Sequence, residues 1–228
     1  MKKIYSVLVL AAAAMSMQAQ TTYTKVTMAP QDWAGTYLIV CEAQSVVFNG
    51  AADELCIDSA GGPAIIQNIT FSGNTLEGTA KLDSAVFTIA ATDSVDWPWS
   101  IQSASGLYIG HKDTADNGLS AEWTIKKKCT QALSIDASGN FIATPRYSTE
   151  GAGAAFTLLY NKKDDNMRFR YYDATGKNKL NVQIYKQSGT PAGLASSSMS
   201  RSAVKQLKNG QIIIVKDGKQ YNVLGGKL

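Results

Sequence analysis

The sequence repeats one four-residue pattern, Ser103-Ala-Ser-Gly106, Asp136-Ala-Ser-Gly139 and Asp173-Ala-Thr-Gly176, and this repeat decides the fold that it predicts. The glycines lie 33 and then 37 residues apart, and each copy follows a run rich in apolar residues. Glycine adopts the positive φ that tight turns need, and Asp or Ser bonds to the backbone of such a turn. The repeat therefore predicts a series of β-hairpins of similar length.

The rest of residues 35 to 187 is also β-like, because short β-branched and aromatic runs recur between Gly, Asn, Asp and Ser, and helical periodicity is hard to find. We expect an all-β protein: a single closed antiparallel barrel or β-trefoil-like domain, since closure removes the exposed edges of many short strands. A two-sheet sandwich is the alternative. The expected strands are 36–40, 45–48, 66–71, 75–79, 85–90, 99–103, 107–110, 122–127, 132–136, 140–143, 155–160, 167–172 and 181–186.

Composition and charge narrow the class of protein. With 45% hydrophobic and 18% charged residues, the 228-residue chain is neither disordered nor collagen-like. The formal charge is +4, but residues 20 to 200 carry 14 basic and 17 acidic side chains, a net charge of −3. The positive surplus lies at the two ends, so we expect no nucleic-acid partner.

The first 19 residues are typical of a secretory signal peptide. Lys2 and Lys3 precede an apolar run from Ile4 to Met15, which is followed by Gln18-Ala19-Gln20. We expect cleavage after Ala19, with Ala14 or Ser16 as alternatives. The run is too short for a membrane span, which needs about 20 apolar residues, so the mature chain should have no transmembrane segment.

The C-terminal end is expected to form a separate unit. Residues 189–203 are small and polar and predict a flexible linker after a body at 20–188. In residues 204–228, Asp217-Gly218 lies between two β-rich runs, as in a two-residue hairpin. The alternative is that these runs are the last two strands of the body.

This C-terminal unit resembles the sorting domains of Bacteroidetes proteins exported by the type IX secretion system. The resemblance covers about 23 residues and ends with Gly226-Lys227-Leu228, where a Gln and a longer basic end are usual. It implies that the export machinery is a partner and that the protein reaches the extracellular space or outer cell surface, with the periplasm as the alternative. The matching residues are Asn209, Gly210, Asp217, Gly218, Tyr221, Asn222 and Gly225.

The body itself is similar to a β-rich module of secreted Bacteroidetes proteins that is sometimes appended to enzymes. This resemblance would cover most of residues 30 to 187, and it carries over no catalytic residue. It rests on Asp32-Trp33-Ala-Gly35-Thr-Tyr37, Val47-Phe-Asn-Gly50, Tyr108-Ile-Gly110 and Arg168-Phe-Arg-Tyr-Tyr172.

Aromatic residues are the candidate binding groups, because sugar rings stack on exposed flat side chains. In the expected strands Trp99 and Trp123 share a face with Ile, so we expect both in the core. The remaining candidates form a possible platform, although packing over the ends of the barrel is the alternative for its aromatic members. The platform residues are Trp33, Trp97, Tyr108, Arg168, Arg170 and Tyr172.

Other chemistry-bearing residues give weak signals. His111 is the single histidine, so no multi-histidine metal site is expected; we expect it at a polar loop position. Asp113 and Asp116 could offer oxygen ligands to calcium, but a plain turn fits their spacing better. We expect no metal, no cofactor and no catalytic residue. Cys41 and Cys56 form a candidate disulfide, and the alternative is three buried thiols including Cys129.

These observations favour an exported, non-catalytic surface module that binds a glycan or a protein partner. Two alternatives stay open. The first is an enzyme of unrecognised type that uses His111 with Asp113 or Asp116. The second is a structural or adhesive surface component.

Overall fold

The computed structural model describes residues 20–55, 62–112, 117–146, 156–173 and 175–188, together with the backbone of three C-terminal strands at 204–208, 211–216 and 219–221. The chain divides into a main unit, Ala19–Gly189, and a second unit that holds the C-terminal strands.

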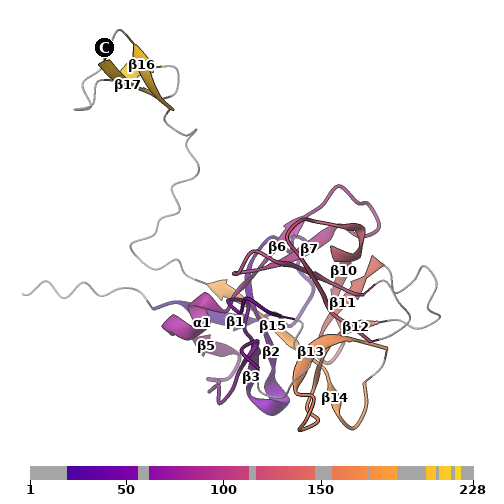
Figure 1. The fold of residues 1–228 in the computed structure, drawn as a ribbon. Coiled ribbons are helices and arrows are strands. Elements are labelled where there is room, and N and C mark those ends of the chain that lie inside the picture. The colour runs from indigo at the N-terminus through magenta and orange to yellow at the C-terminus, as the bar shows by residue number, and fades with distance from the viewer. Residues whose placement is uncertain are drawn as a thin grey trace, which may run out of the picture. The chain divides into compact units, whose positions relative to one another are not determined.

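The main unit consists of antiparallel strands with very little helix (Figure 1). The helical elements are α1 (Ala80–Ser84) and the 3-10 turns η1 (Glu42–Gln44) and η2 (Lys127–Cys129). The all-β prediction is therefore confirmed. The strands are β1 (Thr22–Lys25), β2 (Gly35–Cys41), β3 (Val46–Phe48), β4 (Ile65–Ile66), β5 (Thr75–Glu77), β6 (Phe87–Ala91), β7 (Trp99–Ser103), β8 (Tyr108–Gly110), β9 (Ser120–Glu122), β10 (Thr130–Ile135), β11 (Phe141–Pro145), β12 (Thr157–Asn161), β13 (Arg168–Tyr172), β14 (Lys179–Leu180) and β15 (Gln183–Ser188).

The largest sheet runs in the order β11-β10-β7-β6-β2-β15-β1-β5, and no sheet of the described residues is closed into a barrel. Strands far apart in sequence pair here, since β2 lies between β15 and β6. At the other end of the order, Phe141 in β11 makes an isolated bridge to Val182, the residue before β15, and its N–H donates to the Val182 carbonyl at 2.8 Å.

The second unit is a small antiparallel sheet in which β16 (Val204–Lys208) pairs with β17 (Gln211–Lys216), and β17 pairs with β18 (Lys219–Tyr221). The strands β17 and β18 form a hairpin on either side of Asp217 and Gly218, which lie outside the described residues.

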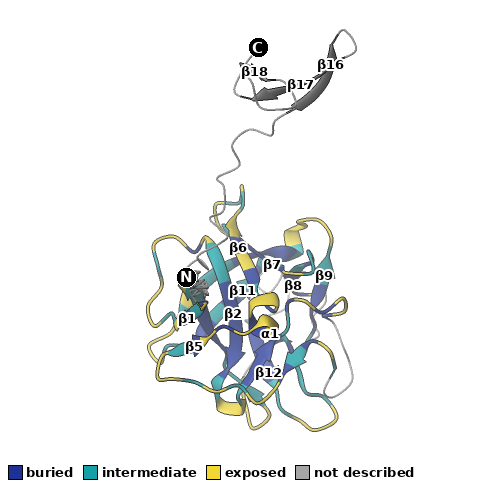
Figure 2. Ribbon diagram, turned by 90° about the vertical axis from the view of Figure 1, so that its left-hand side faces the viewer, coloured by how far each residue is buried: buried dark blue, intermediate teal, exposed yellow. Residues whose placement is uncertain are grey.

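The sequence of β2 is a continuous apolar run because the strand is buried on both faces. Tyr37 and Ile39 belong to the larger buried cluster, while Leu38 and Val40 belong to a second cluster on the other face. Successive side chains of a strand point to opposite faces, so a strand buried on both faces needs apolar residues at every position. Figure 2 shows the buried residues concentrated on the strands and the exposed ones in the connections.

Two of the three turn repeats have the predicted backbone. Gly106 and Gly139 have φ values of 92° and 79°, and their N–H groups donate to Ser103 and Asp136. Gly176 lacks the positive φ, so the glycine argument is wrong there. The three copies lie in the β7–β8, β10–β11 and β13–β14 connections.

Two expected strands are wrong: 66–71, where the strand ends at Ile66, and 122–127. Residues 122–127 were predicted to form a strand with Trp123 in the core, but β9 ends at Glu122. Trp123 is 74% exposed and Ile125 is 48% exposed. The alternation argument fails because the chain after Glu122 leaves the sheet, so side chains two residues apart no longer share a buried face.

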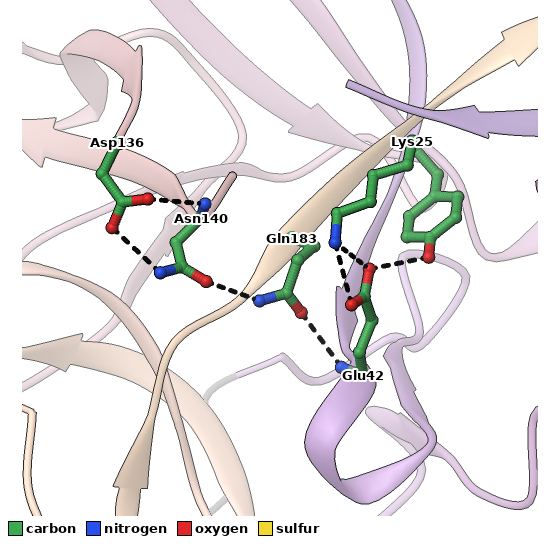
Figure 3. Close-up of polar contacts among 6 residues, drawn as sticks. Lys25, Glu42, Asp136, Asn140 and Gln183 are labelled. Carbon is green, nitrogen blue, oxygen red and sulfur yellow. Dashed lines mark hydrogen bonds and ion pairs between the residues drawn. The ribbon is translucent and has the colours of Figure 1, made fainter. Parts of the chain in front are cut away.

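A chain of polar contacts joins the β10–β11 turn to β15 (Figure 3). The Asp136 carboxylate accepts hydrogen bonds from the Asn140 backbone and side chain, each at 2.9 Å. The side-chain oxygen of Asn140, Oδ1, in turn accepts a hydrogen bond from Gln183 Nε2 at 2.8 Å. The turn is therefore tied to the strand that follows Val182.

The same chain continues from β15 to η1 and β1 (Figure 3). Gln183 Oε1 accepts from the Glu42 backbone N–H at 3.1 Å. The Glu42 carboxylate pairs with Lys25 Nζ at 2.8 Å and accepts from the Tyr185 hydroxyl at 2.7 Å. Burial and the neighbouring Glu42 carboxylate raise the pKa of Tyr185, so this hydroxyl stays a donor.

Candidate functional site

The larger of two described pockets, here called the α1 pocket, lies between residues 66–72 and the segment that ends in α1. Its volume is about 550 Å³, which is within the range of small-ligand sites. The lining residues are Ile66, Gln67, Asn68, Ile69, Thr70, Phe71, Ser72, Glu77, Thr79, Lys81 and Leu82.

The α1 pocket has an apolar floor and a polar rim. Ile66 and Leu82 are buried, and Phe71 is half-buried with its ring 6.0 Å from that of Tyr185. The exposed polar rim consists of Gln67, Asn68, Thr70, Ser72, Glu77, Thr79 and Lys81. Apolar surface with a few polar groups around it is the usual composition of a ligand pocket.

Local contacts fix the helical wall of the α1 pocket. Thr79 is the N-cap of α1, and its hydroxyl accepts from the Leu82 N–H at 3.2 Å. Asp83 accepts a hydrogen bond from the buried Tyr23 hydroxyl at 2.8 Å. Burial, together with the Asp83 carboxylate, raises the pKa of Tyr23. Gly78 permits close packing, because a Cβ there would meet Thr21 and Asp83 at 2.6 Å.

The opposite wall is held by the backbone. The Ile69 N–H donates to the Ser45 carbonyl at 3.1 Å, and Ser72 and Thr75 exchange backbone hydrogen bonds. Asn68 has a φ of 62°, the left-handed conformation that Asn tolerates better than most residues. Both walls are therefore formed without a ligand.

The second pocket, here called the basic pocket, lies between the β6–β7 connection and the segment around η2. Its volume is about 430 Å³. Two lysines, an arginine and an aspartate are among its described lining residues. The lining residues are Ala91, Thr92, Asp93, Ser94, Ile125, Lys126, Lys127, Thr130 and Arg146.

Glu122 anchors the lysine-rich wall of the basic pocket. Its carboxylate makes ion pairs with Lys126 and Lys128. Hydrogen bonds from these two ammonium groups lower the pKa of Glu122 to about 2. The carboxylate therefore stays ionised in all but strong acid, and it holds the chain on the approach to η2.

The predicted platform residues do not assemble into one surface. Trp33 is 4% exposed, its ring centroid lies 5.7 Å from that of Phe141, and its carbonyl accepts from the Tyr37 hydroxyl. Tyr172 is also buried, with Lys179 Nζ 5.1 Å from its ring centroid. Trp33 and Tyr172 therefore offer no exposed ring for stacking; both pack into the body, which is the alternative given for the aromatic members of the platform.

The other four platform residues, Trp97, Tyr108, Arg168 and Arg170, are partly exposed. None of them lines either pocket. Trp97 belongs to the connection that supplies Thr92 and Ser94 to the basic pocket, and its carbonyl accepts from the Thr92 hydroxyl at 3.0 Å. A binding role for these four residues stays a prediction.

Two sequence signals pointed to the pockets and were missed. Thr79 followed by Ala-Lys-Leu is an N-cap residue before helix formers, which marks the start of α1. The second is the run Lys126-Lys127-Lys128, which is a cluster of positive charge although its first two residues belong to the expected strand 122–127.

His111 is fully buried, so its expected polar loop position is wrong. Its ring lies 4.2 Å from that of Phe156 and meets the edge of Tyr171 at 6.1 Å. The Tyr171 hydroxyl donates to Gln131 at 2.7 Å. Asp113 and Asp116 lie outside the described residues. Acid–base catalysis by His111 would need access that its burial does not offer.

Cys41 and Cys129 are buried free thiols, and burial raises the pKa of both, that of Cys41 to about 11. Cys56 lies outside the described residues, and because Cys41 is a free thiol the predicted Cys41–Cys56 disulfide is not formed in this structure. Among the described residues no group of three or more His, Cys, Asp or Glu side chains is placed to hold a metal ion.

Within the described part of the chain, no helix has the length and apolar character needed to cross a bilayer. Comparison with family models, with curated proteins and with solved structures finds no match for this chain.

Proposed function

We propose that this protein is an exported, non-catalytic surface module whose body binds a glycan in the α1 pocket. The observation that carries the proposal is the pocket itself: about 550 Å³, with an apolar floor beneath amide, hydroxyl and charged groups. A sugar presents one apolar face of C–H groups and a ring of hydroxyls. That combination matches a floor containing Phe71 and a rim containing Gln67 and Glu77.

The proposal is tested by titrating the full chain with neutral and N-acetylated oligosaccharides. Gln67→Ala and Glu77→Gln each remove a rim group that is exposed, so the fold should tolerate both. Loss of one hydrogen bond to the ligand is worth about 1 kcal/mol, which weakens affinity about fivefold. The measurement is calorimetric affinity for each variant.

Glu54→Gln is the matched control, because Glu54 is exposed and does not line the α1 pocket. It should leave affinity unchanged. Absence of binding across the panel, or equal effects of Glu54→Gln and Glu77→Gln, would contradict glycan binding in this pocket. The protein-partner alternative would be favoured if the chain bound no glycan but bound a purified surface protein, and if Glu77→Gln weakened that binding.

We also infer that the body closes as a β-trefoil-like ring of β2, β6, β7, β10, β11 and β15. Neighbours in this series form antiparallel ladders, and the Phe141–Val182 bridge joins β11 to the start of β15. A two-stranded hairpin accompanies each third of the ring: β3–β4, β8–β9 and β12–β13. The chain thus repeats the order strand, hairpin, strand.

The registers support a threefold arrangement. Within each third, the first strand pairs with the last. The equivalent pairs are Tyr37 with Phe87, Trp99 with Gln131, and Phe141 with Val182. Pairs between thirds begin two residues further along each strand: Ile101 with Ile89, Ala143 with Leu133, and Ile39 with Ile184. In all six strands the residue that pairs between thirds lies two positions after the residue that pairs within a third. The same offset in every third is what a repeated unit requires.

Export rests on the two ends of the sequence. We propose that residues 1–19 direct the chain through the inner membrane and that residues 204–228 are read by a second export machine. The support is the basic and apolar N-terminal pattern and the Asp217-Gly218 hairpin motif.

A further inference from the structure

We propose that the basic pocket is a second binding site, which takes the carboxylate or sulfate groups of an acidic glycan. This goes beyond the proposed function, because the pocket shares no lining residue with the α1 pocket.

The charge around the basic pocket is opposite to that of the body. Among the described lining residues the three cations Lys126, Lys127 and Arg146 outnumber the one acid, Asp93. Glu122 lies beside the lysine-rich wall and is paired with Lys126 and Lys128. Residues 20 to 200 carry 14 basic and 17 acidic side chains, so the body as a whole is mildly negative. A local concentration of positive charge in a recess attracts anionic groups, and the recess strengthens the attraction by excluding part of the water.

Hydrogen bonds fix the wall formed by the β6–β7 connection. The Thr92 N–H donates to the Pro98 carbonyl at 2.8 Å, and the Thr92 hydroxyl donates to the Trp97 carbonyl at 3.0 Å. The Trp97 N–H donates to Ser94 Oγ at 3.2 Å. This connection is therefore formed before any ligand binds.

The lysine-rich wall is fixed as well. The Cys129 N–H donates to the Lys126 carbonyl at 2.8 Å, and the Thr130 hydroxyl donates to the Lys127 carbonyl at 2.8 Å. The ion pair with Glu122 holds the Lys126 side chain, while Lys127 is exposed. Preformed walls reduce the entropy that a ligand must offset on binding.

The remaining lining favours a sugar over other anions. Ser94 supplies a hydroxyl that can donate, because its oxygen only accepts from the Trp97 N–H. The Thr92 and Thr130 hydroxyls donate within the walls and can offer a sugar only an acceptor oxygen. Ala91 and Ile125 supply apolar surface beside the cations. A volume of about 430 Å³ has room for a sugar ring that bears a charged group. None of the described lining residues is aromatic, so none of them offers a ring for base stacking, which disfavours single-stranded nucleic acid.

The test measures binding of the full chain to four probes: polygalacturonate, dextran sulfate, unmodified dextran and duplex DNA. We expect binding to one or both acidic glycans, weakened by added salt, and none to dextran. The two acidic probes distinguish a carboxylate ligand from a sulfate ligand. Lys127→Glu should weaken this binding by about tenfold, the equivalent of about 1.4 kcal/mol.

Lys177→Glu is the matched control. Lys177 is exposed, lies outside the pocket and gives the same change in net charge. It should change affinity less than about twofold. Equal weakening by the two variants, no binding to either acidic glycan, or tighter binding to DNA than to both would overturn the proposal. Glu77→Gln should leave acidic-glycan binding unchanged, which separates this site from the α1 pocket.

Discussion

Glu122 is the residue whose charge matters most to the wall of the basic pocket. Its pKa is lowered to about 2 by Lys126 and Lys128, from an ordinary value of 4.5. A lowered folded-state pKa stabilises the protein above the unfolded value, and this contribution is lost as pH falls from about 4.5 towards 2. The group is close to solvent, so screening limits the effect to about 1 kcal/mol.

We therefore expect Glu122→Gln to lower the free energy of unfolding by about 1 kcal/mol at pH 7. The difference from the unmodified chain should shrink steadily below pH 4.5. Urea unfolding at pH 7, 4 and 2.5 measures it. Glu54→Gln is the control, because it removes an exposed carboxylate outside this ion pair, and its effect on stability should not depend on pH in this way. A loss of stability in Glu122→Gln that is the same at every pH would show that packing and not charge is responsible.

Single residues were also where prediction from sequence was weakest. Period-two alternation places a side chain correctly only inside a strand, so Trp123 was misplaced when β9 ended one residue before it. Trp33 and His111 precede or follow strands and looked like loop residues, yet both are buried. Burial outside a strand depends on which distant segments cover it, as Phe141 covers Trp33 and Phe156 covers His111.

At the scale of elements, the polar contacts of Asn140 test how β11 and β15 are joined. Asn140→Ala removes the side-chain bonds to Asp136 and to the buried Gln183. An unsatisfied buried amide costs about 1 to 2 kcal/mol. We expect that loss of stability, together with faster hydrogen exchange of the Phe141 amide, which donates to the Val182 carbonyl.

The measurement is amide exchange by NMR alongside thermal unfolding. Asn178→Ala is the control, because Asn178 has an exposed side chain outside this chain of contacts. Slow exchange at Phe141 that Asn140→Ala leaves unaltered would show that β11 and β15 are joined independently of the turn. Fast exchange at Phe141 in the unmodified chain would contradict the inferred ring.

The elements themselves were largely predictable. Turn residues and β-branched runs located most strands, because these are local signals. The pairing of β2 with β15 and β6 was not predictable, since it joins Val40 to Gln183 and Tyr37 to Phe87, which are 143 and 50 positions apart. The sequence does not predict the α1 pocket, because residues 66–71 are expected to form a strand, whereas only Ile65–Ile66 pairs.

At the scale of the whole molecule, deletion of residues 204–228 separates folding from export. The strands β16, β17 and β18 pair with one another, and the body strands pair among themselves. We therefore expect the truncated chain to keep its melting temperature within about 2 °C, a change of less than about 1 kcal/mol, and to accumulate in the periplasm. Cell fractionation with calorimetry decides this: equal surface display of both forms would refute sorting by this segment, and an insoluble truncated chain would place β16–β18 in the fold of the body.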